Sequence, residues 1–224
     1  MSIPVFAKPI GSTETMSSLS AFLLHLHPRT LPETAANIRF TWCMGGIAVW
    51  MFALEVVTGV LLMLHYVPSA SGAYPSVQSV THVVPYGFFI RNLHYWCGQI
   101  MVGAVVLHMI RVVITGAYAP PRQFNWLIGL GLLVATLIVD FTGYLLLWDD
   151  RGLWAWTIAR NLAEIAPIAG PFLANLLFGP PDAGDLALVR LFAWHVIIFP
   201  GLIAGLMAWH FWRIRKDGGI SVTL

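Results

Sequence analysis

The chain has 224 residues, of which 58% are hydrophobic and 10% are charged, and its formal net charge is +2. Soluble globular domains are about half apolar and about a quarter charged, so this composition excludes an ordinary soluble domain and indicates a protein of the lipid bilayer. A net charge this small, without a basic run, gives no support to nucleic-acid binding.

Residues 1–40 are predicted to be an N-terminal interfacial segment. They lack a charged start followed by an apolar run and a small-residue cleavage site, so no secretory signal peptide is expected. An apolar cluster followed by basic residues predicts a short amphipathic helix in the membrane interface, with a frayed tail as the alternative. The cluster comprises Leu19, Phe22, Leu23 and Leu24, and His25, His27 and Arg29 follow it.

Residues 41–224 are predicted to form one domain with four membrane-spanning helices. The hydrocarbon core of a bilayer is about 30 Å thick and needs roughly 20 apolar residues per helix. Four segments meet this requirement: Thr41–Tyr66, Phe88–Ala117, Asn125–Trp148 and Leu188–Ile214. A bundle is expected because each helix can bury its polar groups only against the others. Cys43 and Cys97 fall within spans, so a disulfide framework is not indicated.

The connection Asp149–Ala187, between the third and fourth spans, carries apolar residues at helical spacing. Its pattern is interrupted by Pro167, Pro171, Pro180 and Pro181. We therefore expect two short amphipathic helices on the membrane surface. The predicted fold is an all-α membrane protein: a four-transmembrane-helix bundle with an amphipathic N-terminal helix and two short surface helices.

Basic residues near the ends of the spans predict the orientation of the chain. The side that holds both termini carries Lys8, Arg29, Arg39, Arg111, Arg122, Arg213, Arg215 and Lys216. The other side carries Arg91, Arg151, Arg160 and Arg190, together with most of the acidic residues. Both termini are therefore expected on the negative, cytoplasmic side.

Four of the eight histidines lie well inside predicted spans, His94 and His108 on the second and His195 and His210 on the fourth. A separation of 14 residues returns a helical side chain to within about 40° of the same face, roughly 21 Å further along, and 15 residues give about 60° and roughly 22 Å. Both spans start on the same side. His94 is therefore expected at the depth of His195, and His108 at the depth of His210.

Two histidine pairs without a nearby carboxylate or thiolate indicate haem iron. Zinc normally takes four ligands, whereas a haem iron already has four ring nitrogens and needs only two axial ligands. The alternative is a set of histidines hydrogen-bonded in a polar bundle interior.

Glycines recur at the same interval as the histidines. Gly45 and Gly59 are 14 residues apart on the first span, as are Gly129 and Gly143 on the third. Because glycine has no side chain, each of these four positions leaves a notch in the helix surface. Such notches would let a flat macrocycle approach the backbone. Ordinary small-residue packing between membrane helices is the competing explanation.

The second span reads FIRNLHYWCGQIMVGAVVLHMIRVVITGAY, the third ends in TGYLLLWDD, and the tail reads WHFWRIRKDGGIS. Together these segments resemble the cytochrome b family from about Pro28 onward. The chain length and the 15-residue histidine spacing are similar to the short, split form, cytochrome b6 of cytochrome bf complexes.

The resemblance implies roles for individual residues. His94 and His195 would ligate a positive-side, low-potential haem b, and His108 and His210 a negative-side, higher-potential haem b. Arg91 would pair with a haem propionate, although an arginine extending to the interface is the alternative.

Cys43 lies in TWCMGG, where the cytochrome b6 type attaches a third haem, of c type, through one thioether bond. Because no C-x-x-C-H motif is present, sequence chemistry alone would make Cys43 a small buried hydrophobe. Cys97 matches no site of the family and is expected to serve packing.

The resemblance also implies two quinone pockets. Arg215 and Lys216 would border the negative-side quinone-reduction pocket, with a positive-inside cluster as the alternative. Tyr144, Trp148 and the helix within Asp149–Ile168 would line the positive-side quinol-oxidation pocket, with amphipathic surface packing as the alternative.

Three departures from the family pattern affect the positive-side half. Leu147 replaces a proline, Glu55 stands where glutamine is usual, and Asp140 stands where a small residue is usual; Asp150 also replaces a glutamine. Because intramembrane carboxylates are costly and generally functional, we expect Glu55 and Asp140 to adjust the low-potential haem or its proton path.

The implied function is that of a membrane electron-transfer subunit of a quinol:cytochrome c, or plastocyanin-like acceptor, oxidoreductase, in a bacterial inner membrane or a thylakoid-like membrane. The implied partners are a three-helix subunit that completes cytochrome b, a Rieske iron–sulfur protein and a c-type cytochrome, in a dimeric complex. Alternatives are a di-haem membrane anchor of a quinone-linked dehydrogenase or reductase and, from a different class, a small transporter or structural membrane subunit.

Overall fold

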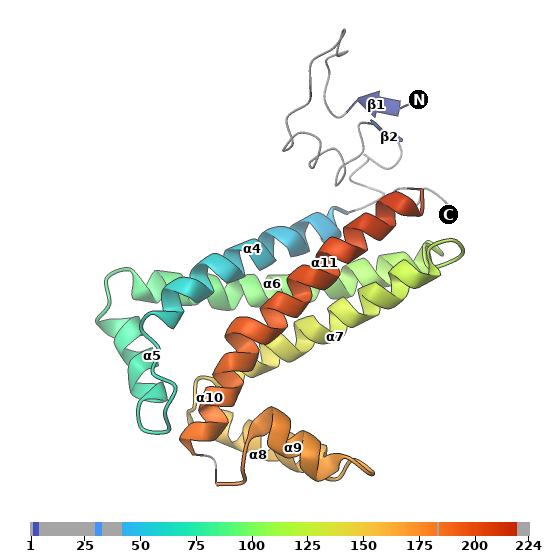
Figure 1. Ribbon diagram of the computed structural model, residues 1–224. Helices are drawn as coiled ribbons and strands as arrows, with labels where there is room; N and C mark the ends of the chain where they lie inside the picture. Colours follow the sequence, from blue (N-terminus) through green and yellow to red (C-terminus); the bar gives the residue numbers. More distant parts are fainter. Residues whose placement is uncertain (1, 5–29, 33–41, 183, 219–224) are drawn as a thin grey trace, which may run out of the picture. The chain divides into compact units, whose positions relative to one another are not determined.

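The computed structural model describes residues 2–4, 30–32, 42–182 and 184–218. Within these ranges, four helices are long and apolar enough to cross a membrane. They are α4 (Met44–Met63), α6 (Gly87–Ile114), α7 (Gln123–Leu145) and a continuous helix from Asp185 to Lys216. The last one consists of α10 (Asp185–Ala193), η1 (Trp194–Ile198) and α11 (Phe199–Lys216). Figure 1 labels α10 and α11 along it. The four predicted spans are confirmed.

Shorter helices occupy the connections between the spans. The two predicted in the long connection are α8 (Asp150–Glu164) and α9 (Gly170–Phe178). A third, α5 (Ala73–His82), lies between the first two spans and was not predicted. Its sequence, AYPSVQSVTH, mixes polar residues with a proline near its start, which gives no clear helical period in so short a segment.

Two short strands, β1 (Ser2–Pro4) and β2 (Thr30–Pro32), pair antiparallel, with Ser2 opposite Pro32. The described residues contain no other strand, and the all-α prediction did not include these two. The predicted amphipathic helix around residues 19–29 lies outside the described residues.

The chain divides into two compact units, and each of the four long helices contributes residues to both. The first unit contains Met1–Ile47, Ala104–Leu133 and Ala204–Leu224. The second contains Ala48–Gly103 and Val134–Ile203. Each proposed haem site therefore falls within a single unit.

The core of the second unit is an apolar cluster where the starts of α5 and α10, the end of α7 and helix α8 meet. It comprises Ala73, Leu145, Trp148, Trp156, Ala187, Leu188 and Leu191. The rings of Trp148 and Trp156 lie 6.0 Å apart between centroids, and Trp156 Nε1 donates to the Phe178 carbonyl at 3.0 Å. Asp149 caps α8, since its carboxylate accepts from Gly152 N at 2.8 Å. These contacts hold α8 and α9 against the end of α7.

The turn at η1 interrupts the α-helical pattern of the fourth span. Within it, Phe199 N–H bonds to the Trp194 carbonyl, five residues earlier. Pro200 follows directly and has no N–H to donate to the carbonyl of Val196. A π-type turn there is a common feature of functional sites, and His195 lies within it.

Candidate functional site

His94 on α6 and His195 in η1 face each other in the second unit. Their ring centroids are 6.2 Å apart and the ring planes make an angle of 76°. A metal–imidazole nitrogen bond is about 2.0–2.1 Å long, so two imidazoles on opposite sides of one metal ion have centroids about 6 Å apart. The separation therefore fits a pair of axial ligands to one iron, and the pair is the one that helical depth predicts.

The His94 ring is anchored through Nδ1. This atom lies 2.9 Å from Thr58 Oγ1 and 2.9 Å from Glu55 Oε2, both on α4. The Thr58 hydroxyl donates to the Leu54 carbonyl at 2.6 Å, so it accepts from the imidazole. Because a metal-bound imidazole carries its proton on the other nitrogen, this arrangement leaves Nε2 of His94 for the metal.

His195 is anchored in a similar way by α7. Its Nδ1 lies 2.9 Å from the Val139 carbonyl oxygen and 3.2 Å from Thr142 Oγ1. The Thr142 hydroxyl itself donates to the same carbonyl at 2.9 Å. Nδ1–H of His195 is thus satisfied by backbone and hydroxyl oxygens, and its Nε2 is the free ligand nitrogen.

The glycines of α4 and α7 admit the imidazoles themselves. A Cβ built on Gly59 would lie 3.2 Å from His94 Cε1, and one built on Gly143 would lie 2.7 Å from His195 Cε1. Real side chains essentially never approach to the second distance. Each of these two notches lets a histidine ring rest against a helix backbone, and the space for a macrocycle beside the four glycines stays a prediction.

The same relationship recurs in the first unit around His108 and His210. A Cβ on Gly45 would lie 3.6 Å from His108 Cε1, and one on Gly129 would lie 3.7 Å from His210 Cε1. These are ordinary contact distances, so the fit is looser than at Gly143.

His210 Nδ1 is buried and makes no hydrogen bond of normal geometry with the described residues, although the Asn125 backbone lies near enough to act on it.

The π-type turn accounts for the unequal histidine spacing. His195 and His210 are 15 residues apart, one more than His94 and His108. A π-type turn holds one residue more than it would as part of an α-helix, so η1 absorbs the extra residue.

The donor set fits haem better than a metal ion held by protein alone. Among the described residues, no group of three or more His, Cys, Asp or Glu side chains is placed to hold a metal ion. Pairs of imidazoles suit an iron that brings four ring nitrogens of its own. The expectation that no carboxylate lies near the histidines is wrong, however, because Glu55 contacts His94.

The threonines were missed by sequence reasoning. Thr58 and Thr142 each precede the glycine that faces the histidine, so the repeated dipeptide Thr-Gly on the first and third spans was the available signal. A hydroxyl beside the notch reaches the Nδ1 atom that rests in it.

The other predicted residues of the second unit are placed as follows. Arg91 donates from Nη1 to Thr81 Oγ1 on α5 at 3.3 Å. Tyr144 is 40% exposed, whereas Trp148 is buried in the apolar core. The position of Trp148 agrees with the packing alternative, while Tyr144 stays available to a ligand. Propionate and quinol roles for these residues stay predictions.

In the first unit, Cys43 is exposed and directly precedes α4, with φ of 51°. Lys216 Nζ lies 4.9 Å from the centroid of the Trp212 ring, in the last turn of α11. Arg215 is exposed on the same turn. Their haem and quinone roles stay predictions.

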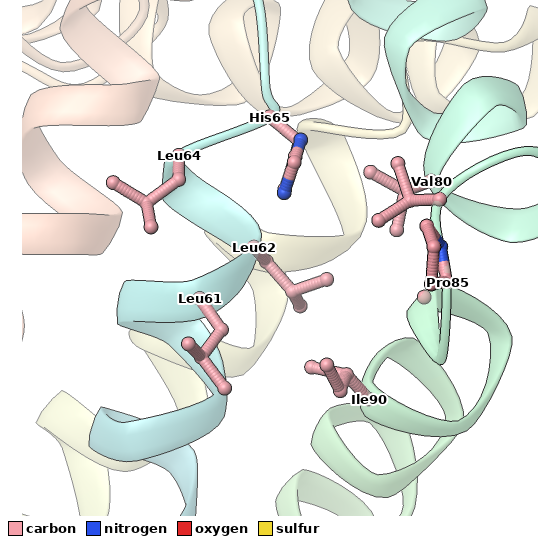
Figure 2. A pocket seen from close by; sticks show the side chains of 9 residues that line it. Leu61, Leu62, Leu64, His65, Val80, Pro85 and Ile90 are labelled. Atoms are coloured by element: carbon pink, nitrogen blue, oxygen red, sulfur yellow. The ribbon is translucent and has the colours of Figure 1, made fainter.

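A small apolar pocket lies beside the end of α4, lined by Leu61, Leu62, Leu64, His65, Val80, Val84, Pro85, Gly87 and Ile90. Figure 2 shows side chains from α4 on one side and from α5 and the start of α6 on the other. Its cavity volume of about 100 Å³ is well below the roughly 300–1,000 Å³ of typical ligand sites. It does not hold a quinone ring system in this form.

Comparisons with known proteins agree with this arrangement. A family model described as cytochrome b/b6/petB matches residues 30–218. The menaquinol:cytochrome c reductase cytochrome b subunit of Geobacillus thermodenitrificans is 36% identical over 180 residues, which are 80% of each chain. Cytochrome b6 of Heliobacterium modesticaldum is 36% identical over 205 residues, 92% of this chain and 95% of that one.

A solved structure described as a hyperthermophilic respiratory Complex III superposes with a TM-score of 0.70 at 26% identity. The match covers 80% of this chain and 48% of the other, so the chain spans about half the length of that relative.

Proposed function

Because the chain belongs to the cytochrome b/b6/petB family, we propose that it is the cytochrome b subunit of a bc- or bf-type quinol:cytochrome c reductase complex. The observation that carries this proposal is the His94–His195 pair, with a centroid separation of 6.2 Å and both Nδ1 atoms hydrogen-bonded. His108 and His210, each against a glycine, form the second site.

Each site is proposed to hold one b-type haem, which His94 and His195 would ligate in the first site and His108 and His210 in the second. Haem, when bound, supplies reversible one-electron transfer. The protein contributes the rest: Thr58, Glu55, Thr142 and the Val139 carbonyl orient the rings of the first site, and the apolar helices keep water away.

Two haems at different depths would carry electrons across the membrane between a quinol-oxidation site and a quinone-reduction site, coupled to proton translocation. Tyr144 and Trp148 are proposed for the first pocket and Arg215 and Lys216 for the second. Arg91 is proposed as the partner of a haem propionate, which would compete with its hydrogen bond to Thr81.

A covalent c-type haem at Cys43 is a separate proposal. The exposed thiol at the start of α4 is accessible to a vinyl group. A peroxidase-activity stain of the denatured chain tests it, since only covalently attached haem survives denaturation. Cys43→Ala should abolish the signal and Cys97→Ala should keep it; an unstained wild-type chain would refute the attachment.

The proposed partners are a three-helix subunit that completes cytochrome b, a Rieske iron–sulfur protein and a c-type cytochrome, in a dimeric complex. Both termini are proposed to lie on the negative side of a bacterial inner membrane or a thylakoid-like membrane. Reporter fusions at each terminus test this orientation, because a reporter active only in the cytoplasm should be active at both ends.

The test of the central proposal is haem content. The full chain, purified from membranes with its native partners, should contain two b-type haems, and His94→Ala and His108→Ala should each leave one. His65→Ala is the matched control, because His65 lies outside the long helices and should leave both haems. A wild-type chain without a reduced b-type band would refute both sites.

A further inference from the structure

The two proposed ligands of the second unit differ in what their Nδ1 atoms contact. His195 is held by a backbone carbonyl and a threonine hydroxyl, both neutral. His94 is held by a threonine hydroxyl and by the carboxylate of Glu55, with both distances 2.9 Å. One side of the site is therefore supported by a group that can carry charge, and the other is not.

The position of Glu55 corresponds to that of Val139. Each residue lies four positions before the glycine against which the histidine rests, Gly59 on α4 and Gly143 on α7. Residues four apart share one face of a helix. On α7 this turn offers a carbonyl oxygen to the imidazole, while on α4 it offers a side-chain carboxylate.

The surroundings of Glu55 contain little else that could explain its presence. Its other oxygen, Oε1, is buried without a hydrogen-bond partner among the described residues. A carboxylate inside a membrane span is costly and is usually kept for function. The contact that the structure provides in return is the one between Glu55 Oε2 and His94 Nδ1, at 2.9 Å.

A second carboxylate, Asp140 on α7, lies close by. A Cβ built on Gly98 of α6 would stand 3.4 Å from Asp140 Oδ1 and 3.7 Å from Glu55 Oε1. Asp140 accepts from Gln99 Nε2 at 3.3 Å and makes no hydrogen bond or ion pair with His94 or His195 among the described residues. The two carboxylates are thus neighbours with different partners.

We propose that Glu55 is a positioning residue for His94: its carboxylate shares the Nδ1–H with the Thr58 hydroxyl, helps to fix the ring with Nε2 toward the iron, and lowers the reduction potential of the haem bound there. This inference rests on the proposed haem ligation by His94. It assigns to Glu55 a direct contact with a ligand and leaves Asp140 a more distant influence.

The physical reason is the negative charge of Glu55 beside Nδ1 of His94, the ring nitrogen that does not bind the iron. An imidazole that donates to a carboxylate is a stronger electron donor than one that donates to a neutral oxygen. A negative charge near the iron also favours the oxidised, more positive state, and a low dielectric strengthens this effect. Hydrogen bonding around axial ligands and burial are established determinants of haem potential.

The experiment compares midpoint potentials of the two b-type haems in the full complex. Glu55→Gln keeps the size and one acceptor oxygen of the side chain but removes its charge. We expect it to retain both haems and to favour reduction of the His94–His195 haem about tenfold, which corresponds to about 59 mV for one electron. The other haem should keep its potential.

Two further variants make the result specific. Asp140→Asn removes a neighbouring intramembrane charge without touching His94, and it should shift the same haem by less than half as much. Glu55→Asp keeps the charge, and its potential should lie closer to wild type than that of Glu55→Gln. A potential shifted equally by Glu55→Asp and Glu55→Gln would show that charge is not the cause.

The outcomes separate this inference from the proposed function. An unchanged potential in a Glu55→Gln protein that retains both haems overturns the inference and leaves the haem sites intact. Full haem content in His94→Ala overturns the ligation itself. If Glu55→Gln loses the haem, the Glu55→Asp protein decides: a retained haem at near wild-type potential supports the charged acceptor, and loss of the haem there contradicts it.

Discussion

The imidazole of His195 occupies the space that a side chain at Gly143 would need, since a Cβ there would stand 2.7 Å from His195 Cε1. Gly143→Ala should therefore push the ring away from α7 and weaken its bonds with Thr142 and the Val139 carbonyl. Overpacking of this kind costs about 1–3 kcal/mol. We expect the haem content of the His94–His195 site to fall below half, measured from reduced spectra of the purified complex.

Gly129→Ala is the matched control for that substitution. A Cβ at Gly129 would meet His210 Cε1 at 3.7 Å, an ordinary contact distance. This variant should keep most of the haem of its own site. Equal haem loss in the two variants would contradict the view that the closeness of the ring sets the requirement for glycine.

Thr58→Val and Thr142→Val test the hydroxyls beside the notches. Each removes a hydrogen bond to an imidazole Nδ1, at 2.9 Å for His94 and 3.2 Å for His195, and keeps the shape of the side chain. Loss of an outer hydrogen bond to a metal ligand typically lowers affinity about 10–100-fold. We expect haem to leave this site faster in both variants. The rate is measured as the transfer of haem to an added acceptor protein.

Thr115→Val is the control for the hydroxyl series. Thr115 Oγ1 donates to the Arg111 carbonyl one turn earlier on α6, and in the described part of the chain no histidine is among its hydrogen-bond partners. Its replacement should leave the rate of haem loss unchanged. A comparable acceleration in this variant would assign the effect to helix destabilisation in general.

The four spans and the histidine pairs could be predicted because both follow from helix length and period. The contact between Glu55 and His94 was not predicted, although its signal was present: Glu55 lies one helical turn before Gly59, so both residues share a face. What the sequence did not reveal was which face of α4 meets which histidine. That relationship depends on how helices rotate about their axes, and periodicity alone leaves it open in helices that are apolar all round.

The π-type turn and helix α5 were missed for local reasons. The available signal for the π-type turn was Pro200, but a proline alone does not distinguish a kink from a π-type turn. Helix α5 depends on tertiary contacts, since Ala73 lies in the core with Leu145 and Leu188. Its own residues provide too few apolar positions to define a face.

Asp149→Ala should destabilise helix α8 and the packing of α8 against α9. The Asp149 carboxylate accepts from Gly152 N at 2.8 Å, and loss of an N-cap costs about 1 kcal/mol. We expect proteolysis between α8 and α9 to become several-fold faster at equal protein concentration. Asp149→Asn should cleave at the wild-type rate because asparagine caps a helix about as well as aspartate. If both variants were cleaved faster than the wild type and to the same extent, the charge of Asp149, and not its capping bond, would be what holds this end of α8.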